Sequence, residues 1–193
     1  MFDHLVYLID DLPATVAQFA RLGVPTSPGG RHLSRGTHNA LLRLGERQYL
    51  ELLAVDPATH ISPPRWMGID LGNLPRISRW AASAGKMPDG QPLQSGQRDL
   101  PNGQTLKWKL TDPGSQPAIS ILPFLIDWGA DGPHPADSLP DLGFYLDELR
   151  LIHPDPATIN RQLQRLELPQ RAIRGPSPKI EAVIRGPETE LIL

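Results

Sequence analysis

Cysteine is absent from this chain of 193 residues. Its absence excludes disulfides, thiolate metal sites and thiol nucleophiles, which leaves histidine and carboxylate side chains as possible metal ligands. The sequence also lacks a run of about 20 apolar residues, the length that spans a bilayer. Its N-terminus lacks a basic segment followed by an apolar one. We therefore expect a cytoplasmic protein with no membrane partner.

Neither positive nor negative charge predominates in the chain. The chain has 19 lysine and arginine residues against 21 aspartate and glutamate residues, a net charge of -2, and the arginines are scattered among the acids. This distribution does not favour nucleic-acid binding or an acidic lipid partner. Hydrophobic residues make up 39% of the chain, which is enough for a core in one medium domain or two small ones.

Turn-forming residues, by contrast, are abundant, since 22 prolines and 17 glycines indicate many short strands and turns. Residues 1–57 are typical of one β-α-β-β-β unit. An apolar strand over residues 5–9 precedes a helix that ends at Gly23. Two further strands, over 37–44 and 49–55, flank a tight turn and predict a hairpin.

A second unit of the same kind is predicted over residues 64–130. The eleven-residue interval from Leu12 to Gly23 recurs from Leu74 to Gly85, which indicates an internal repeat. The unit is predicted to contain a strand over 66–71, a helix over 74–85 with the apolar stripe Ile77, Trp80, Ala81 and Ala84, and strands over 93–98, 104–110 and 119–128.

A third, degenerate βαβββ-like unit is predicted over residues 140–193. Its expected elements are a strand over 144–152, a helix that begins at Pro156, and strands over 172–174, 179–185 and 189–193. The fold class predicted is therefore α+β with repeated βαβββ modules, of which the first two together form one domain over 1–130. The third unit either packs beside the first two or pairs across a twofold axis in a homodimer, and we favour the dimer.

Short motifs spread over most of the chain strengthen this interpretation. They are Asp3-His4-Leu5-Val6, Gly29-Gly30-Arg31-His32, Gly36-Thr37-His38-Asn39, Tyr49-Leu50-Glu51-Leu52-Leu53, the run from Leu122 to Trp128, and His134-Pro135. With these motifs the chain resembles the vicinal oxygen chelate superfamily and, within it, the glyoxalase-like domain branch of the glyoxalase/bleomycin resistance/dioxygenase fold. The resemblance implies curved mixed sheets around a cleft, helices outside, and metal ligands on the first and last strands of each module.

Transferred to this chain, the resemblance implies a divalent metal site. His4 and Glu51 match the ligand positions of the first module, while Trp66 falls opposite His4 and Asp127 opposite Glu51. The set His4, Glu51 and Asp127 suits Mn, Fe, Co, Ni or Zn without selecting among them. Tryptophan in place of a second histidine argues against glyoxalase I and extradiol dioxygenase activity.

The strand patterns support the two acids independently of the resemblance. Glu51 alternates with apolar residues on its strand, and Asp127 lies in a largely apolar run. A buried carboxylate must be neutralised, hydrogen-bonded or bound to a cation. The alternative to a metal is an arginine or a backbone amide beside each acid, and His4 is equally explained as a structural histidine.

The loop residues and tryptophans are candidates for ligand binding. Arg31 or His32 is placed to hold an anionic or carbonyl group, and Thr37 or Asn39 to orient it. The alternative for these four is turn chemistry. Trp66, Trp108 and Trp128 are candidates for the walls of an apolar cleft, although aromatic residues on strands are also ordinary core. The face of the sheet on which His38 lies stays open.

These residues lead to two main functional hypotheses. The first is a metal-dependent lyase or isomerase acting on a small oxygen-bearing metabolite, with Glu51 or Asp127 moving a proton. The second is a metal-free protein that sequesters a drug-like or aromatic small molecule, with Trp66 and Trp108 stacked on it. A third is an assembly module whose cleft is filled by its own side chains.

Overall fold

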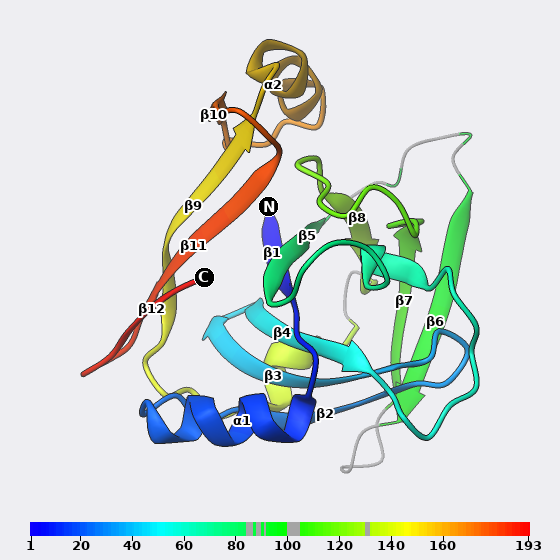
Figure 1. Cartoon of the computed structure of the whole chain (residues 1–193), viewed down its shortest axis with the longest axis vertical. Helices are drawn as coiled ribbons and strands as arrows, with labels where there is room; N and C mark the ends of the chain where they lie inside the picture. Colours follow the sequence, from blue (N-terminus) through cyan, green and yellow to red (C-terminus); the bar gives the residue numbers. More distant parts are fainter. Residues whose placement is uncertain (84–86, 88–89, 91, 100–104, 130–131) are drawn as a thin grey trace.

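A computed structural model of the chain describes residues 1–83, 87, 90, 92–99, 105–129 and 132–193. The chain forms an eight-stranded curled mixed sheet and a four-stranded sheet (Figure 1). No helix in these ranges is long and apolar enough to cross a membrane.

The first unit has the predicted β-α-β-β-β order, but residues 29–32, predicted to lie in a loop, belong to a strand. It consists of β1 (Phe2–Leu8), α1 (Leu12–Arg21), β2 (Ser27–His32), β3 (Thr37–Gly45) and β4 (Gln48–Val55). The Asp11 carboxylate accepts a hydrogen bond from the backbone N–H of Ala14 and so caps α1. The β3–β4 hairpin pairs along its whole length, and β4 returns to lie parallel to β1.

The second unit consists of η1 (Trp66–Gly68), β5 (Arg76–Ser83), β6 (Leu93–Asp99), β7 (Thr105–Thr111) and β8 (Phe124–Asp127). The predicted helix over 74–85 is wrong, because its residues up to Ser83 form a strand. The predicted strand over 66–71 is also wrong, because it begins with the short 3-10 helix η1. Ala84, Gly85 and Gln104, which belonged to predicted elements, lie outside the described residues.

Helical spacing wrongly predicted a helix over 74–85 because β5 is buried on both faces. Six consecutive residues of β5 are buried, and they include Ser78 and Arg79. A strand covered on both sides carries apolar residues at adjacent positions, and some of them recur by chance at helical spacing. The buried Arg79 is tolerated because its guanidinium donates to backbone carbonyls, among them those of Pro113 and Pro117.

The order of strands in the large sheet shows the internal repeat. The order is β2-β3-β4-β1-β5-β8-β7-β6, with β1 and β5 antiparallel at the centre. Each half therefore places its first strand at the centre, parallel to its last strand. This arrangement confirms the predicted fold class, although the described part of the second unit has no α-helix, only the 3-10 helix η1.

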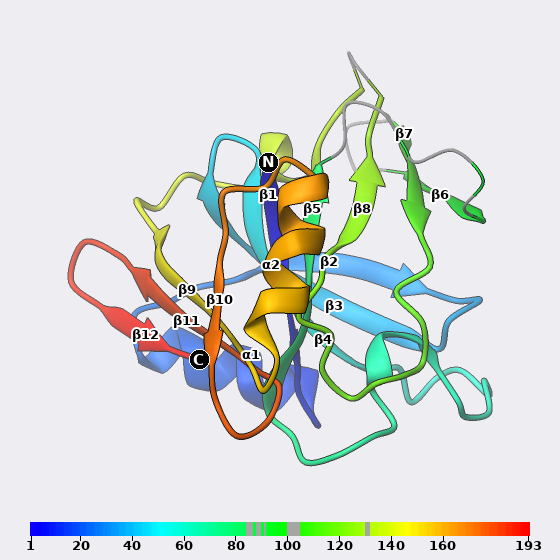
Figure 2. The same cartoon turned by 90° about the horizontal axis from the view of Figure 1, so that it is seen from above.

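The third unit follows η2 (Pro135–Ser138) and consists of β9 (Tyr145–His153), α2 (Pro156–Arg165), β10 (Ala172–Arg174), β11 (Lys179–Arg185) and β12 (Glu190–Ile192). Its sheet has the order β10-β9-β11-β12, and α2 lies beside β10 (Figure 2). The order differs from that of the first unit, because β9 pairs in parallel with the first strand after the helix and not with the last.

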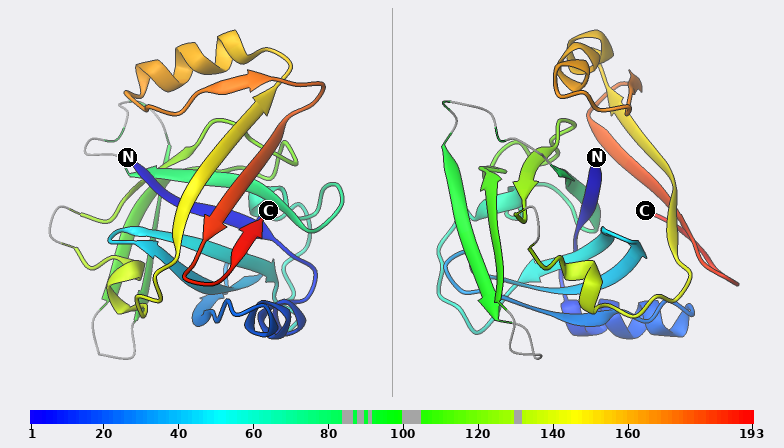
Figure 3. Two further views of the ribbon diagram at one scale, coloured as in Figure 1. Left: turned by 90° about the vertical axis from the view of Figure 1, so that its left-hand side faces the viewer. Right: turned by 180° about the vertical axis from the view of Figure 1, so that it is seen from behind.

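The four-stranded sheet packs on the side of β1 and β5 that faces away from the interior of the large sheet (Figure 3). Ile77 and Trp80 of β5 share one apolar core with Leu151, Ile180 and Ile184 of the third unit. The third unit therefore lies beside the first two within the chain, which is the first of the two predicted arrangements.

Candidate functional site

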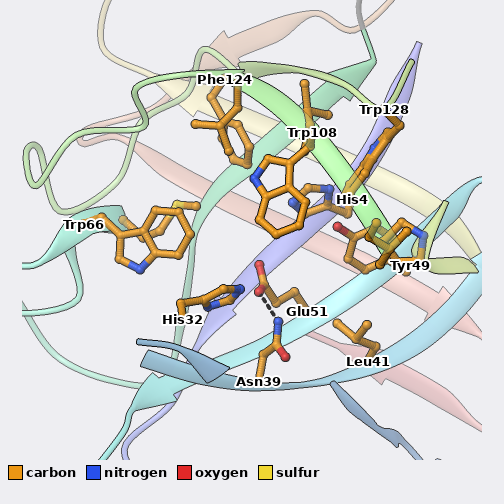
Figure 4. Close-up of a pocket in the computed structure, with 15 residues that line it drawn as sticks. His4, His32, Asn39, Leu41, Tyr49, Glu51, Trp66, Trp108, Phe124 and Trp128 are labelled. Carbon is orange, nitrogen blue, oxygen red and sulfur yellow. Dashed lines mark hydrogen bonds between the residues drawn. The ribbon is translucent and has the colours of Figure 1, made fainter. Parts of the chain in front are cut away.

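A small pocket lies inside the curl of the eight-stranded sheet (Figure 4). We call this cavity of about 50 Å³ the inner pocket; its lining residues are His4, His32, Asn39, Leu41, Tyr49, Glu51, Trp66, Met67, Leu106, Trp108, Leu110, Phe124, Ile126, Trp128 and Pro135. Strand alternation brings every second residue of β3 and β4 to it. His38 is two positions from Ala40 and adjacent to the pocket-lining Asn39, so it belongs to the opposite, helix-packed face with Ala40.

Glu51 is held in the pocket by an amide and not by a cation. The carboxyl is buried, with 5% of the residue exposed, and its Oε1 accepts a hydrogen bond of 2.6 Å from Asn39 Nδ2. Asn39 Oδ1 in turn accepts from the backbone N–H of Gly30 at 2.6 Å, which fixes the orientation of the amide. Within the described ranges Glu51 forms no ion pair, and its Oε2 makes no hydrogen bond. That oxygen is available to a ligand.

Gly29 makes this arrangement sterically possible. A Cβ at this position would lie 1.9 Å from Asn39 Oδ1. A side chain here would therefore displace the amide that holds Glu51. The glycine pair of β2 serves the pocket through a close backbone approach.

His4 is oriented by the acid that precedes it. Its Nδ1 lies 2.7 Å from Asp3 Oδ1. Phe2 pairs with Ala82 and His4 with Ala81, so Asp3 is the extra residue of a β-bulge in β1. Adjacent side chains on a regular strand point to opposite faces, and the bulge is what lets these two meet.

Asp3 lies at the centre of a buried polar cluster. Its Oδ2 accepts hydrogen bonds from Ser83 Oγ at 2.5 Å and Trp128 Nε1 at 3.1 Å, and lies 3.4 Å from His134 Nε2. Burial raises the pKa of Asp3, but hydrogen bonds from His134 and His4 outweigh it and hold that pKa well below its ordinary range. The carboxylate is therefore ionised, and it accepts the hydrogen of His4 Nδ1.

The ring of His4 is fixed from two further sides. It stacks on Tyr49 with 4.4 Å between ring centroids, and meets the edge of Phe124 at 5.4 Å. With Nδ1 donating to Asp3, Nε2 is the nitrogen left for a ligand, and it has no hydrogen-bond partner in the described part of the chain. The opposite tautomer is fixed at His134, whose Nδ1 accepts from the backbone N–H of Ala136.

The tryptophans form walls of the inner pocket. Trp66, Trp108 and Trp128 all line the inner pocket, and the last two pack together with 5.6 Å between centroids. Thr37 is fully buried and lies behind the wall, where its Oγ1 accepts from Trp66 Nε1 at 3.1 Å and lies 3.1 Å from His32 Nδ1. Thr37 thus positions two lining residues and does not itself line the pocket.

Asp127 is not brought together with the other two predicted metal ligands. Alternation on β8 sends Phe124 and Ile126 into the pocket. Asp127, one position beyond, lies in a separate surface depression with Lys107, and its Oδ1 accepts from the backbone N–H of Gly129 at 2.8 Å. Trp66 does not occupy the position across from His4 either, because that strand position belongs to Ala81 of β5.

The inner pocket does not fit a metal centre. It is lined by two imidazoles, His4 and His32, and by one carboxyl group, Glu51, but a metal site needs three or four side chains that converge on one point. Among the described residues, no group of three histidine, aspartate or glutamate side chains is arranged to hold an ion. The predicted set His4, Glu51 and Asp127 is therefore not assembled.

Several residues of the site are not foreseen by the sequence. Asp3 and His134 meet through a bulge and a contact between distant segments, and Tyr49 and Phe124 read as ordinary strand residues. The adjacency of Asp3 and His4 in the first motif is the one available signal. Arg31, predicted to touch a ligand, lies outside the inner pocket and pairs with Asp56 through Nε at 2.5 Å.

Comparisons with known proteins agree with this fold. Residues 2–167 match the family described as a glyoxalase-like domain. A comparison with curated protein sequences finds no match. A crystal structure of a hypothetical protein from Staphylococcus aureus has a TM-score of 0.71 at 16% identity, covering 97% of this chain and 92% of that chain.

Shorter matches are found among methylmalonyl-CoA epimerases. A variant of the Streptomyces coelicolor epimerase in complex with 2-nitronate-propionyl-CoA has a TM-score of 0.44 at 18% identity, covering 67% of this chain and 97% of that one. The enzyme from Mycobacterium tuberculosis has a TM-score of 0.43 at 17% identity, covering 66% and 87%.

Proposed function

Because the chain belongs to the glyoxalase-like domain family of the vicinal oxygen chelate superfamily, we propose that it is an isomerase or lyase that moves a proton on a small molecule, without a metal ion. The observation that carries this proposal is the Asp3–His4 pair, which orients an imidazole toward the same aromatic pocket as the Glu51 carboxyl. Two groups that exchange protons, held in one water-poor cavity, suit acid–base chemistry.

His4 is the proposed proton acceptor. Since Asp3 binds the Nδ1 hydrogen, Nε2 carries the lone pair and takes a proton from a carbon next to a carbonyl group. The electrons of the broken C–H bond form a C=C bond, and the π electrons of the carbonyl group move to its oxygen, which gives an enolate. The ionised Asp3 then stabilises the imidazolium that forms. Glu51 is the proposed group that delivers a proton to the ligand, and in the reverse direction the two residues exchange roles. Positioned groups of this kind contribute about 10²–10⁴-fold to a rate.

Asn39 and Tyr49 support these two groups. Asn39 donates to one oxygen of Glu51, so the other oxygen keeps a fixed direction. Tyr49 stacks on the imidazole and prevents its rotation. A pair of groups held in this way needs little reorganisation when the proton moves.

The test is proton exchange between ligand carbons and deuterium oxide, followed by NMR over a panel of small ketones, 2-oxo acids and 2-hydroxy ketones, with a chelator present. The wild-type protein is expected to catalyse exchange with at least one compound. His4→Asn and Glu51→Gln should each reduce the rate by about 100-fold or more. His153→Asn and Glu46→Gln change the same residue types at positions outside the pocket and should leave the rate unchanged.

A requirement for added metal would contradict the proposal, as would full activity in both pocket variants. Binding of panel compounds without any exchange would instead support the second hypothesis, a small-molecule binding protein. The observation that favours this alternative is the set of three tryptophans around the pocket, which offers stacking surfaces to an aromatic ligand.

A further inference from the structure

A second cavity adjoins the inner pocket. This outer chamber has a volume of about 360 Å³ and lies between the segment that joins β2 to β3 and strand β6. His32, Trp66, Trp108 and Leu110 line both cavities, so the same aromatic side chains separate and connect them. The two spaces therefore form one site with a small inner part and a larger outer part.

The size of the inner pocket limits what enters it. A water molecule needs about 10–15 Å³ of such space, so about 50 Å³ holds only a few ligand atoms. A ligand of metabolite size that places its reacting atoms beside His4 and Glu51 must place the rest in the outer chamber.

The outer chamber is positively charged. Two of its described lining residues are arginines, Arg31 and Arg35, and none is an aspartate or glutamate. Arg35 donates through Nη2 to the uncharged Gln94 and lies over Trp66, with its Cζ 5.3 Å from the ring centroid. No carboxylate in the described ranges pairs with Arg35.

Arg31 is only partly neutralised. Its side chain is 49% exposed, and only its Nε contacts the buried Asp56. Hydrogen bonding to this guanidinium lowers the pKa of Asp56, so the acid is ionised and cancels one of the two positive charges. One net positive charge is left on the wall of the chamber.

We propose that the outer chamber binds the anionic group of an elongated ligand, a carboxylate or a phosphate, whose apolar end passes between Trp66 and Trp108 into the inner pocket. Guanidinium groups suit oxyanions because they donate two parallel hydrogen bonds. Arg35 is the main contact, since its present partner is a neutral amide that an anion displaces. This inference rests on the proposed function only for the statement that the apolar end is the reacting end.

The competing explanation is structural. In it, the link from Arg35 to Gln94 only ties the segment after β2 to β6, and the charge has no ligand. That explanation predicts a loss of stability in Arg35 variants and no preference for anions.

The test is a calorimetric titration of the full chain with phenylacetate, 3-phenylpropionate and 4-phenylbutyrate, each compared with its neutral amide. We expect at least one carboxylate to bind about tenfold or more tightly than its amide. Arg35→Gln should abolish this preference, while Arg35→Lys should retain part of it. Arg47→Gln, at an exposed turn, is the matched control and should bind like the wild type. Thermal unfolding of each variant separates loss of fold from loss of binding.

Equal binding of acids and amides would overturn the inference, as would an unchanged preference in Arg35→Gln or no binding of any acid at millimolar concentration. Failure of the proposed function is distinguishable from these outcomes. If proton transfer is absent but the preference for acids depends on Arg35, the chamber stands as an anion site. If Glu51-dependent exchange occurs equally well on acids and on neutral ketones, the proposed function stands and the chamber inference fails.

Discussion

Replacing Asp3 with asparagine removes the negative charge that orients His4. An amide has one accepting oxygen, whereas the carboxylate accepts at Oδ1 from His4 and at Oδ2 from Ser83 and Trp128. If the amide oxygen stays on the side of Ser83 and Trp128, its NH₂ group faces His4 Nδ1. The imidazole must then carry its hydrogen on Nε2, and it presents a donor to the pocket in place of a proton acceptor.

The cost in stability follows from the same contacts. Losing one hydrogen bond to a charged group costs about 2 kcal/mol. Replacing the charged partner by a neutral one weakens the two remaining hydrogen bonds, from Ser83 and Trp128, and the contact with His134 at 3.4 Å; this costs about 1 kcal/mol each, or about 3 kcal/mol together. The neutral amide avoids the cost of burying a charge, which offsets the loss of stability by about 2 kcal/mol. We expect Asp3→Asn to lower the free energy of unfolding by about 3 kcal/mol at pH 7.

The difference should depend on pH in one direction. The pKa of Asp3 in the folded protein lies below its ordinary value, which is near 4 in an unfolded chain. The stabilisation is therefore fully present above about pH 5 and is lost progressively as the pH falls below 4. Urea unfolding of both proteins at pH 7 and at pH 3 measures the change, with Asp10→Asn at an exposed position as the control.

The imidazole itself provides a second measurement. Nitrogen-15 NMR distinguishes the two histidine tautomers, and His4 should change from the Nδ1–H form to the Nε2–H form in Asp3→Asn. An unchanged tautomer together with unchanged stability at pH 7 would refute the reasoning, because it would mean that Asp3 neither orients His4 nor holds the cluster together.

Three further substitutions test other contacts. Gly96→Ala places a Cβ 2.3 Å from Trp108 Cε2, so the indole should shift into the inner pocket. We expect aryl carboxylates to bind about tenfold more weakly, a loss of about 1.4 kcal/mol. An unchanged affinity by calorimetry would argue against this. Asn39→Leu leaves the Glu51 carboxyl and the Gly30 N–H without their partners and should cost about 1–3 kcal/mol in urea unfolding; a loss below about 0.5 kcal/mol would mean that water replaces the amide. Arg79→Met deprives the carbonyls of Pro113 and Pro117 of donors and should lower Tm by roughly 6–12 °C, from about 3 kcal/mol of lost stability; an equal or higher Tm in a melting curve would contradict it.

Local signals made the first unit predictable. The cap of α1, the alternation on β3 and β4 and the turn between them depend on neighbouring residues, and the structure follows them closely. Glu51 on the pocket face follows from the same alternation. The fold class was predictable because strand and turn patterns recur along the chain and because the short motifs resemble a known family, although the apparent recurrence of the helix at residues 74–85 is a strand.

The errors arise where distant contacts decide the outcome. β5 reads as a helix because burial on both faces removes the alternation that marks a strand. The prediction for Asp127 depends on its matching Glu51 in the other module, and a shift of one position on a strand moves a side chain to the other face. The role of Asp3 depends on a bulge against β5 and on donors from Ser83 and Trp128, none of which a single sequence specifies.

The packing of the third unit shows that the part of the chain that folds together is longer than the part that matches the family. The family match ends at residue 167, before β11 begins. Yet Ile180, Ala182 and Ile184 of β11 cover Trp80, on the far side of the strand whose Ala81 pairs with His4. A chain shortened to the matched residues would expose this apolar face and loosen the central strands from behind. The last 26 residues of the 193 therefore support a pocket that none of them touches.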